Sequence, residues 1–151
     1  SLIAEGTAEA AIDIIFSPEE KLAFLETVLF PMAGFDQTRA REYEAVMNLT
    51  KKLNYAMTEV ARRLLDGAIS EPRAIDLLMK YSLVPRSRAE KKIQFIRQYR
   101  GYVINYTLGK DLVLKYLETR APGGTDAEKR KQLFRDLLVR PIVPADIRPK
   151  S

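Results

Sequence analysis

Apolar residues recur every three or four positions along almost the whole chain, and no segment alternates with period two for long enough to form a strand. Spacings of three and four place side chains on one face of an α-helix. The longest such pattern runs from Gln37 to Asp66 and ends at Gly67, a residue type common at helix C-termini. The sequence therefore predicts an all-α fold of about six or seven helices in an antiparallel bundle-like array.

Capping sequences mark where several of these helices begin. Ser17-Pro18-Glu19-Glu20, Ser87 with Glu90, and Thr125 with Glu128 all have the Ser/Thr-x-x-Glu pattern of a capping box. The final segment, RPIVPADIRPKS, is rich in proline and predicts an extended tail. The chain length suits one helical domain that spans residues 1–151.

Two residue types are missing, and their absence excludes several kinds of site. The chain has no cysteine and no histidine. Disulfides, thiolate chemistry, Ser-His-Asp triads and histidine-bearing zinc sites are therefore impossible within these 151 residues. The net charge of +5 comes from well-mixed basic and acidic residues, so nucleic acid is not the expected partner. No apolar run is long enough to predict a membrane span.

The chain begins at Ser1 rather than at methionine, and a helical pattern starts at once with Leu2 and Ile3. No signal-peptide pattern precedes it. We therefore expect the chain to be a piece of a longer protein, and the sequence assigns no cell compartment.

Four aromatic residues form a stripe within the segment from Ala89 to Leu117. Phe95, Tyr99, Tyr102 and Tyr106 follow one another at spacings of four, three and four, which predicts that they share one helix face. The rings either pack in the core or present one or two phenols to a cleft. A phenol in a cleft can donate a hydrogen bond to a developing oxyanion.

Basic residues and glycines accompany the aromatic stripe. Arg97 and Arg100 could bind a substrate carboxylate, or they could lie on a solvated or ion-paired face. Gly101 and Gly109 interrupt the helical pattern, so either another helix or a ligand is expected to approach closely there.

An acidic face is expected near the N-terminus. Glu5, Glu9 and Asp13 are spaced by four, so they lie on one face of a helix. This arrangement is either an exposed acidic face or a source of metal ligands and acid/base groups.

Two segments resemble motifs of the bacterial gluzincin-like zinc metallopeptidases, the HExxH hydrolases. LIAEGTAEAAI is similar to the Glu-Gly helix of that family, and YRGYVINYTLG resembles a later motif that reads roughly P-G-Q-A-x-x-Y-K-x-G. Gly101, Tyr106 and Gly109 match the later motif in register, whereas Arg100 and Tyr102 stand where it has Pro and Gln. The resemblance covers residues 1–117, and residues 118–151 form the C-terminal helix and tail.

The resemblance implies a peptide-hydrolysis site that uses zinc. Glu5 falls on the position of the third zinc ligand, while the HExxH helix with the two histidine ligands would lie upstream of Ser1. Tyr106 would stabilise the oxyanion, and Tyr102 is a second candidate without a motif match. The resemblance implies that the full-length protein, of which this chain would be a part, binds zinc. The 151 residues alone are expected to bind no zinc and to have no peptidase activity.

The alternative function is a helical protein-interaction module without chemistry. Such a module would bind a protein through an apolar groove. For a chain that lacks its N-terminal half, the expected partners are that half and a second copy of the chain, because uncovered apolar surface favours self-association. For the peptidase hypothesis we expect Phe95 and Tyr99 to serve packing, and Tyr106 to face the same cleft as Glu5.

Overall fold

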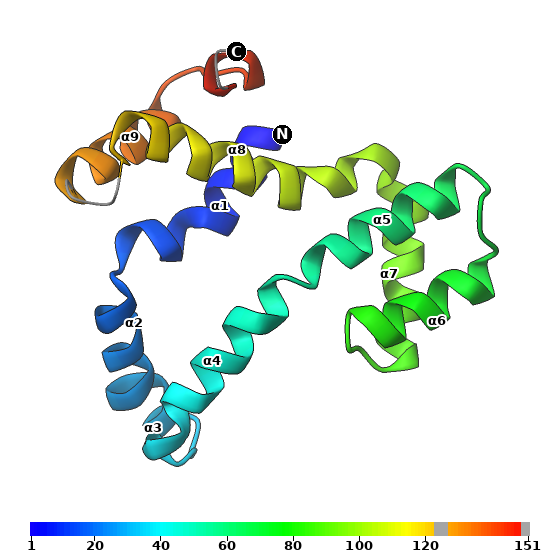
Figure 1. The fold of residues 1–151 in the computed structure, drawn as a ribbon, viewed down its shortest axis with the longest axis horizontal. Coiled ribbons are helices and arrows are strands. Elements are labelled where there is room, and N and C mark those ends of the chain that lie inside the picture. Colours follow the sequence, from blue (N-terminus) through cyan, green and yellow to red (C-terminus); the bar gives the residue numbers. More distant parts are fainter. Residues whose placement is uncertain (123–126, 149–151) are drawn as a thin grey trace.

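The computed structural model describes residues 1–122 and 127–148, and every regular element in these ranges is helical (Figure 1). The all-α fold class predicted from the sequence is thereby confirmed. The α-helices are α1 (Leu2–Ile15), α2 (Pro18–Phe24), α3 (Phe30–Met32), α4 (Ala40–Lys51), α5 (Asn54–Leu65), α6 (Glu71–Tyr81), α7 (Arg86–Tyr99), α8 (Ile104–Arg120) and α9 (Ala127–Val139).

Shorter helical segments complete the chain. A π-helical segment, Leu25–Leu29, joins α2 to α3, and 3-10 segments span Gln37–Arg39, Arg100–Val103 and Pro144–Ile147. None of the helices within residues 1–122 and 127–148 has the length and apolar content needed to cross a membrane.

Of the three predicted capping boxes, the one at Ser17 is present and the one at Ser87 is not. The Ser17 hydroxyl accepts from the Glu20 amide at 3.1 Å, and the Glu20 carboxylate accepts from the Ser17 amide at 2.8 Å, so this box is confirmed. The box predicted at Ser87 is wrong, because α7 already begins at Arg86 directly after Pro85. Proline fixes its own φ near the helical value and so suits a helix start. Thr125 lies outside the described residues.

The long pattern from Gln37 to Asp66 does not form one helix. α4 ends at Lys51 and α5 begins at Asn54, although the two run nearly in line (Figure 1). At the junction the Lys52 and Leu53 amides each bond to the carbonyl three residues earlier, which tightens the turn. The hydrophobic period continues through this tight turn, which is why the sequence pattern did not reveal it.

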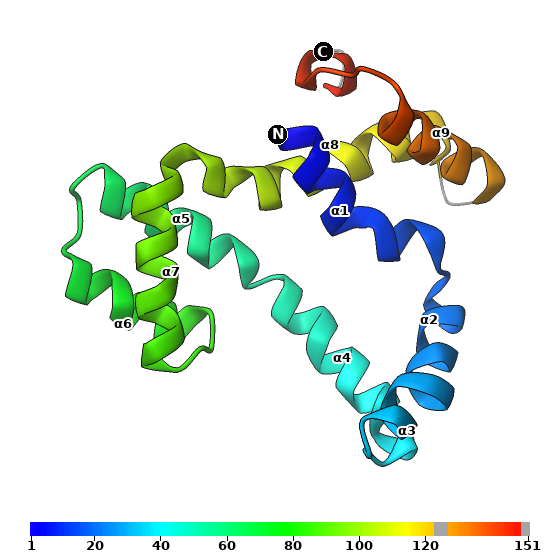
Figure 2. The same ribbon diagram turned by 180° about the vertical axis from the view of Figure 1, so that it is seen from behind.

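The aromatic segment is also broken, at Arg100. Its φ of 48° lies in the left-handed region that non-glycine residues seldom adopt. A 3-10 segment follows, and α8 then leaves at a large angle to α7, as both ribbon views show (Figures 1 and 2). The predicted stripe is therefore carried by two helices and the bend between them.

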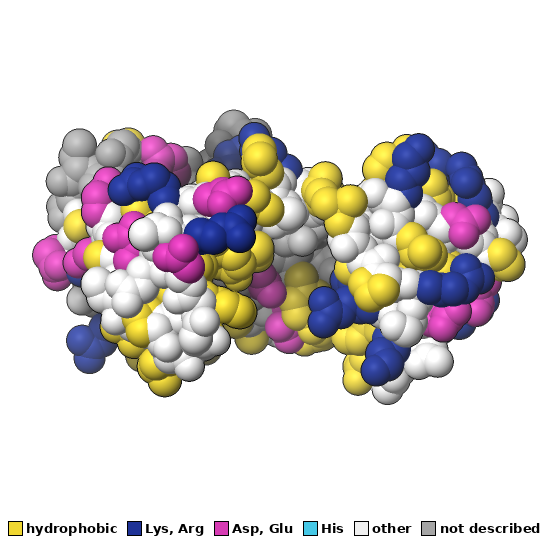
Figure 3. Space-filling view, turned by 90° about the horizontal axis from the view of Figure 1, so that it is seen from below, with side chains coloured by type: hydrophobic (Ala, Val, Ile, Leu, Met, Phe, Trp, Pro, Cys, Tyr) yellow, Lys and Arg dark blue, Asp and Glu magenta, His cyan; other side chains and the backbone are white. Residues whose placement is uncertain are grey.

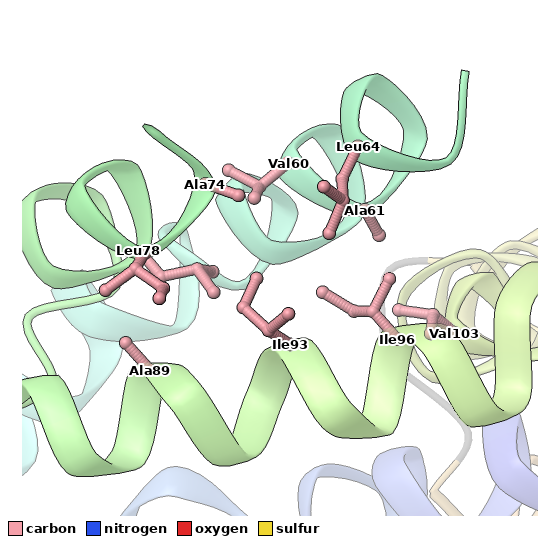
Figure 4. Close-up of a cluster of buried hydrophobic side chains, with 10 residues drawn as sticks. Val60, Ala61, Leu64, Ala74, Leu78, Ala89, Ile93, Ile96 and Val103 are labelled. Atoms are coloured by element: carbon pink, nitrogen blue, oxygen red, sulfur yellow. The ribbon is translucent and has the colours of Figure 1, made fainter. Parts of the chain in front are cut away.

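Two hydrophobic clusters hold the helices together. The first lies between α5, α6 and α7, where Ala89, Ile93 and Ile96 of α7 face residues of the other two helices (Figure 4). The second joins α1, α8 and α9 to the C-terminal tail. Ile147 anchors that tail, since only 1% of its surface is exposed. The residues after Arg148 lie outside the described ranges.

The backbones of α1 and α8 approach each other closely where the two helices cross. A Cβ at Gly109 would lie 2.5 Å from the Leu2 carbonyl oxygen, and a Cβ at Gly6 would collide with the Gly109 backbone. The close approach predicted for Gly109 is therefore a helix–helix contact. Gly101 differs, because a Cβ there would have no atom within 4 Å and the residue belongs to the bend after Arg100.

Gly109→Ala should destabilise the fold by about 2 kcal/mol or more, since backbone atoms cannot move aside as a flexible side chain can. Gly101→Ala is the matched control and should be neutral or stabilising by about 0.5 kcal/mol, because it removes backbone freedom from the unfolded chain without a clash. Chemical denaturation measures both values. Equal stability of the two variants would contradict the tight crossing.

Candidate functional site

The crossing of α1 and α8 brings Glu5 next to a tyrosine that lies 97 residues later in the chain. The Tyr102 hydroxyl donates to Glu5 Oε1 at 2.7 Å. The Ser1 amino group donates to the same hydroxyl oxygen at 3.2 Å. The hydrogen bond to the Glu5 carboxylate raises the pKa of Tyr102, because ionising the phenol would remove the donor and place two negative charges together.

The four aromatic rings gather although the helix that carries them is broken. Ring centroids are 4.6 Å apart for Phe95 and Tyr99, 6.2 Å for Tyr99 and Tyr102, and 6.1 Å for Tyr102 and Tyr106. The ring centroids of Phe95 and Tyr106 are also 6.1 Å apart, so each ring contacts two others of the four. These distances are typical of favourable aromatic pairs. The bend thus preserves the predicted cluster on a different backbone path.

The individual rings differ in their surroundings. Phe95 is half-buried and packs against the first hydrophobic cluster, as predicted. Tyr99 packs its ring on Phe95 and Tyr102, and 45% of its surface is exposed, so it is a packing residue at the edge of the cluster. It lies in the last turn of α7, just before the bend at Arg100 turns the chain away.

Tyr106 is half-buried, and its hydroxyl makes no hydrogen bond with any described residue. Burial raises the pKa of Tyr106, and the negative charges of Glu5 and Glu9 raise it further. The phenol therefore stays protonated at neutral pH and can donate a hydrogen bond. The structure brings Glu5, Tyr102 and Tyr106 together in one cluster, which we call the carboxylate–phenol cluster.

The two predicted substrate-binding arginines do not join this cluster. Arg97 on α7 forms an ion pair with Glu71 of α6, with an N–O distance of 2.6 Å. Arg100 is exposed in the bend and has no ion-pair partner among the described residues. For Arg97 the ion-paired surface is therefore the alternative that the structure favours.

The acidic face of α1 is neutralised at one end. Asp13 accepts from Lys51 at 2.9 Å and from Lys110 at 2.8 Å. Burial alone would raise the pKa of Asp13, but the two ammonium groups outweigh it and the pKa is lowered. Asp13 therefore links α1 to α4 and α8 as a structural ion pair.

The acidic side chains do not converge on a metal. No cluster of three or more acidic side chains among residues 1–122 and 127–148 could hold an ion. Glu5 is a single carboxylate that accepts a hydrogen bond from the Tyr102 phenol. The described residues therefore do not form a complete zinc site.

A groove adjoins the carboxylate–phenol cluster, and the sequence patterns did not predict it. It has a volume of about 1090 Å³ and lies between α1, the α4–α5 junction, α7 and α8. Tyr106 and Glu9 line it, whereas Glu5 does not. Glu5 and Tyr106 therefore do not line one common groove, contrary to the expectation from the sequence. Glu5 bonds to Tyr102, whereas Tyr106 lines the groove. The one sequence signal for the groove is the spacing of Arg88, Lys91 and Lys92 on a single helix face.

One wall of the groove is fixed by contacts between α5 and α8. The Tyr55 hydroxyl lies 2.6 Å from both carboxylate oxygens of Asp111, and the hydroxyls of Thr58 and Thr107 lie 3.0 Å apart. The hydrogen bond to Asp111, with smaller effects of burial and charge, raises the pKa of Tyr55 to about 12. These polar contacts set the spacing of the two helices.

No protein-family model, curated protein or solved structure matches this chain. A function can therefore be inferred only from the residues and their geometry. Two neighbouring features stand out, namely the carboxylate–phenol cluster and the groove, and Tyr106 borders both.

Asp111→Asn should return the pKa of Tyr55 from about 12 towards the ordinary value of 10.0, because the charged acceptor is lost. In the wild-type protein the neutral Tyr55 phenol is favoured in the folded state, so the contribution of Tyr55 to stability should be constant below pH 10 and be lost as the pH rises from 10 to 12. The variant should lose this contribution, whereas the contributions of Tyr102 and Tyr106, whose pKa values are also raised, should remain. Tyrosine NMR titration measures the pKa, and Asp66→Asn at the end of α5 is the control that should leave it unchanged.

Proposed function

We propose that this chain is the C-terminal helical half of a zinc-metallopeptidase-like protein. Glu5 would be the third zinc ligand, and Tyr106 would stabilise the oxyanion during peptide hydrolysis. The observation that supports this function is the convergence of Glu5 with Tyr102 and Tyr106 across the α1–α8 crossing. The two segments that resemble the zinc peptidases meet there, although 97 residues separate Glu5 from Tyr102.

The residues of the cluster have properties suited to the proposed roles. Tyr102 holds the Glu5 carboxylate by a direct hydrogen bond, which fixes the direction of the remaining oxygen lone pairs. Zinc, when bound, polarises a scissile carbonyl and activates water. The Tyr106 hydroxyl, protonated and without a partner among the described residues, is free to donate to an oxyanion.

The proposal requires ligands from outside the described residues. One carboxylate does not hold a catalytic zinc, which takes three protein ligands. The resemblance assigns the other two to an HExxH helix upstream of Ser1. The 151-residue chain by itself should therefore bind no zinc at that site and hydrolyse no peptide.

The test uses the full-length protein that contains this chain. Glu5→Gln should lower zinc content and abolish peptide hydrolysis, as measured by elemental analysis and a peptide-cleavage assay. Tyr106→Phe should keep the zinc but reduce kcat by about 100-fold, the usual effect of losing one oxyanion donor. Tyr99→Phe removes the same atom from an exposed ring and should leave kcat unchanged.

Two results would contradict the peptidase proposal. A full-length protein without an HExxH segment and without bound zinc would remove its chemical basis. Wild-type kcat in Tyr106→Phe, alongside normal zinc content, would remove the oxyanion role of this phenol while leaving the role of Glu5 intact.

A second candidate is a protein-interaction module, and the size of the exposed surface supports it. The accessible surface is 10093 Å². A compact monomer of 17.2 kDa would expose roughly 7,800 Å². The view from below shows hydrophobic side chains spread over the surface and a hollow between its two lobes (Figure 3).

One group of exposed apolar side chains lies on the arm formed by α2, α3, α4 and the segments that join them. Its members are Phe24, Leu29, Met32, Phe35, Val46, Met47 and Leu49. A standard protein interface buries about 800 Å² on each partner, which is well below the excess surface. The occupant that fits this arm is a second copy of the chain, since pairing two apolar arms would cover both at once.

Light scattering should therefore give about twice the monomer mass of 17.2 kDa at micromolar concentration. Leu49→Glu, which places a charge in the apolar arm, should shift the protein to the monomer. Val139→Glu changes a similarly exposed apolar residue on α9 and should leave the dimer intact. A wild-type monomer at every concentration would exclude self-association through this arm.

A further inference from the structure

The groove beside Tyr106 carries positive charge that the rest of the described chain does not neutralise. Lys52, Arg88, Lys91 and Lys92 all line it, and none forms an ion pair with a described residue. Arg88, Lys91 and Lys92 lie at spacings of three and four on α7, so they share a face. Like charges on one helix face repel each other, and an anion between them would relieve that repulsion.

Lys92 is the most informative of these cations. It is half-buried, and its ammonium donates a hydrogen bond to the Met57 sulfur at 3.3 Å and forms no ion pair with a described residue. Loss of solvent around the amine lowers the pKa of Lys92, and the neighbouring Arg88 lowers it further. A thioether is a weak acceptor, so Lys92 retains most of its capacity to donate hydrogen bonds.

Ser82 lines the groove at the end of α6 but offers it no donor. Its hydroxyl is buried and makes no hydrogen bond with the described residues. Because this oxygen is closed off from solvent, a ligand in the groove does not reach it, and the accessible donors are the cations.

The acidic residues of the groove do not serve these donors. Asp13 is already paired with Lys51 and Lys110, and Asp111 accepts from Tyr55. Glu9 is exposed on α1 and forms no ion pair with a described residue. The available donors are therefore the cations of α7 together with Lys52 at the α4–α5 junction.

Apolar side chains lie beside the unpaired donors. Met57, Val84 and Phe95 line the groove and are all partly buried. A site with a few polar donors and an apolar lining is typical for ligands that combine a charged group with an apolar body.

We propose that this groove binds a peptide through a carboxylate, which the cations of α7 hold while apolar side chains of the peptide cover Met57 and Phe95. The choice of a peptide as ligand rests on the proposed function, since Tyr106 lines the same groove. The carboxylate is either the C-terminus of the peptide or an acidic side chain. In the proposed peptidase the groove thus selects acidic peptide substrates.

The test measures binding to the 151-residue chain and needs no hydrolysis. Three fluorescent hexapeptides of alanine and leucine are compared by anisotropy: one with a free C-terminus, one amidated with an internal glutamate, and one amidated with glutamine instead. The free acid or the glutamate peptide should bind at least about tenfold more tightly than the neutral peptide, as charge-assisted hydrogen bonds predict. The stronger of the two acids identifies the source of the carboxylate.

Variants locate the binding in the groove. Lys92→Met should weaken acidic-peptide binding by about tenfold and leave the neutral peptide unaffected. Lys115→Met makes the same change on an exposed part of α8 and should have no effect. If Lys92→Met does not fold, Arg88→Gln removes an exposed groove cation, with Arg135→Gln on α9 as its control.

Several outcomes would overturn the inference. They are equal affinity for the three peptides, wild-type affinity in the folded groove variants, and binding of a short single-stranded oligonucleotide in place of the acidic peptides. These outcomes are separate from failure of the peptidase proposal, which is decided by zinc content and kcat of the full-length protein.

Discussion

The packing of α1 against α8 through Gly6 and Gly109 is the contact on which the rest of the structure depends. Without side chains at these positions the two backbones approach closely enough for Tyr102 to donate to Glu5 at 2.7 Å. The same crossing orients α8 so that Lys110 pairs with Asp13. Small residues are the usual means by which helices reach such short separations, because any larger side chain holds the axes apart. The second hydrophobic cluster and the anchored C-terminal tail then cover the crossing.

The bend at Arg100 is the second constraint, and it explains how one stretch of sequence serves both hydrophobic clusters. α7 packs on α5 and α6, whereas α8 packs on α1 and α9. A continuous helix would hold both segments on one axis and could not reach the two clusters from their observed directions. The left-handed φ of Arg100 is unfavourable for a non-glycine residue, and the packing of α7 and α8 in their two hydrophobic clusters offsets this cost. The four aromatic rings lie across this bend and stabilise it by their mutual contacts.

Charge is distributed unevenly around the groove, and this has a bearing on function. On the α1 and α8 side, acidic and basic groups are paired with each other and serve the architecture. On the α7 side, Arg88, Lys91 and Lys92 form no ion pair with a described residue, and the Lys92 ammonium donates to the Met57 sulfur. A thioether is a weak acceptor, so these cations keep most of their capacity to bind an anion. The carboxylate–phenol cluster lies next to this surface through Tyr106.

The sequence by itself determined the all-α class and the capped start at Ser17, because helical period and capping are local properties. It also indicated that the four aromatic residues belong together, but the bend at Arg100 decided how their rings meet. It also singled out Glu5, Tyr102 and Tyr106 as candidates, but their contact required two segments far apart in the chain. Only the tertiary structure decided where the predicted helices break, that Arg97 pairs with Glu71, and that Tyr99 is exposed. The groove also belongs to the tertiary structure, since its walls come from four separate parts of the chain. Helix periodicity records which face of each element is apolar, whereas these features depend on how whole elements cross, and that is set by long-range packing.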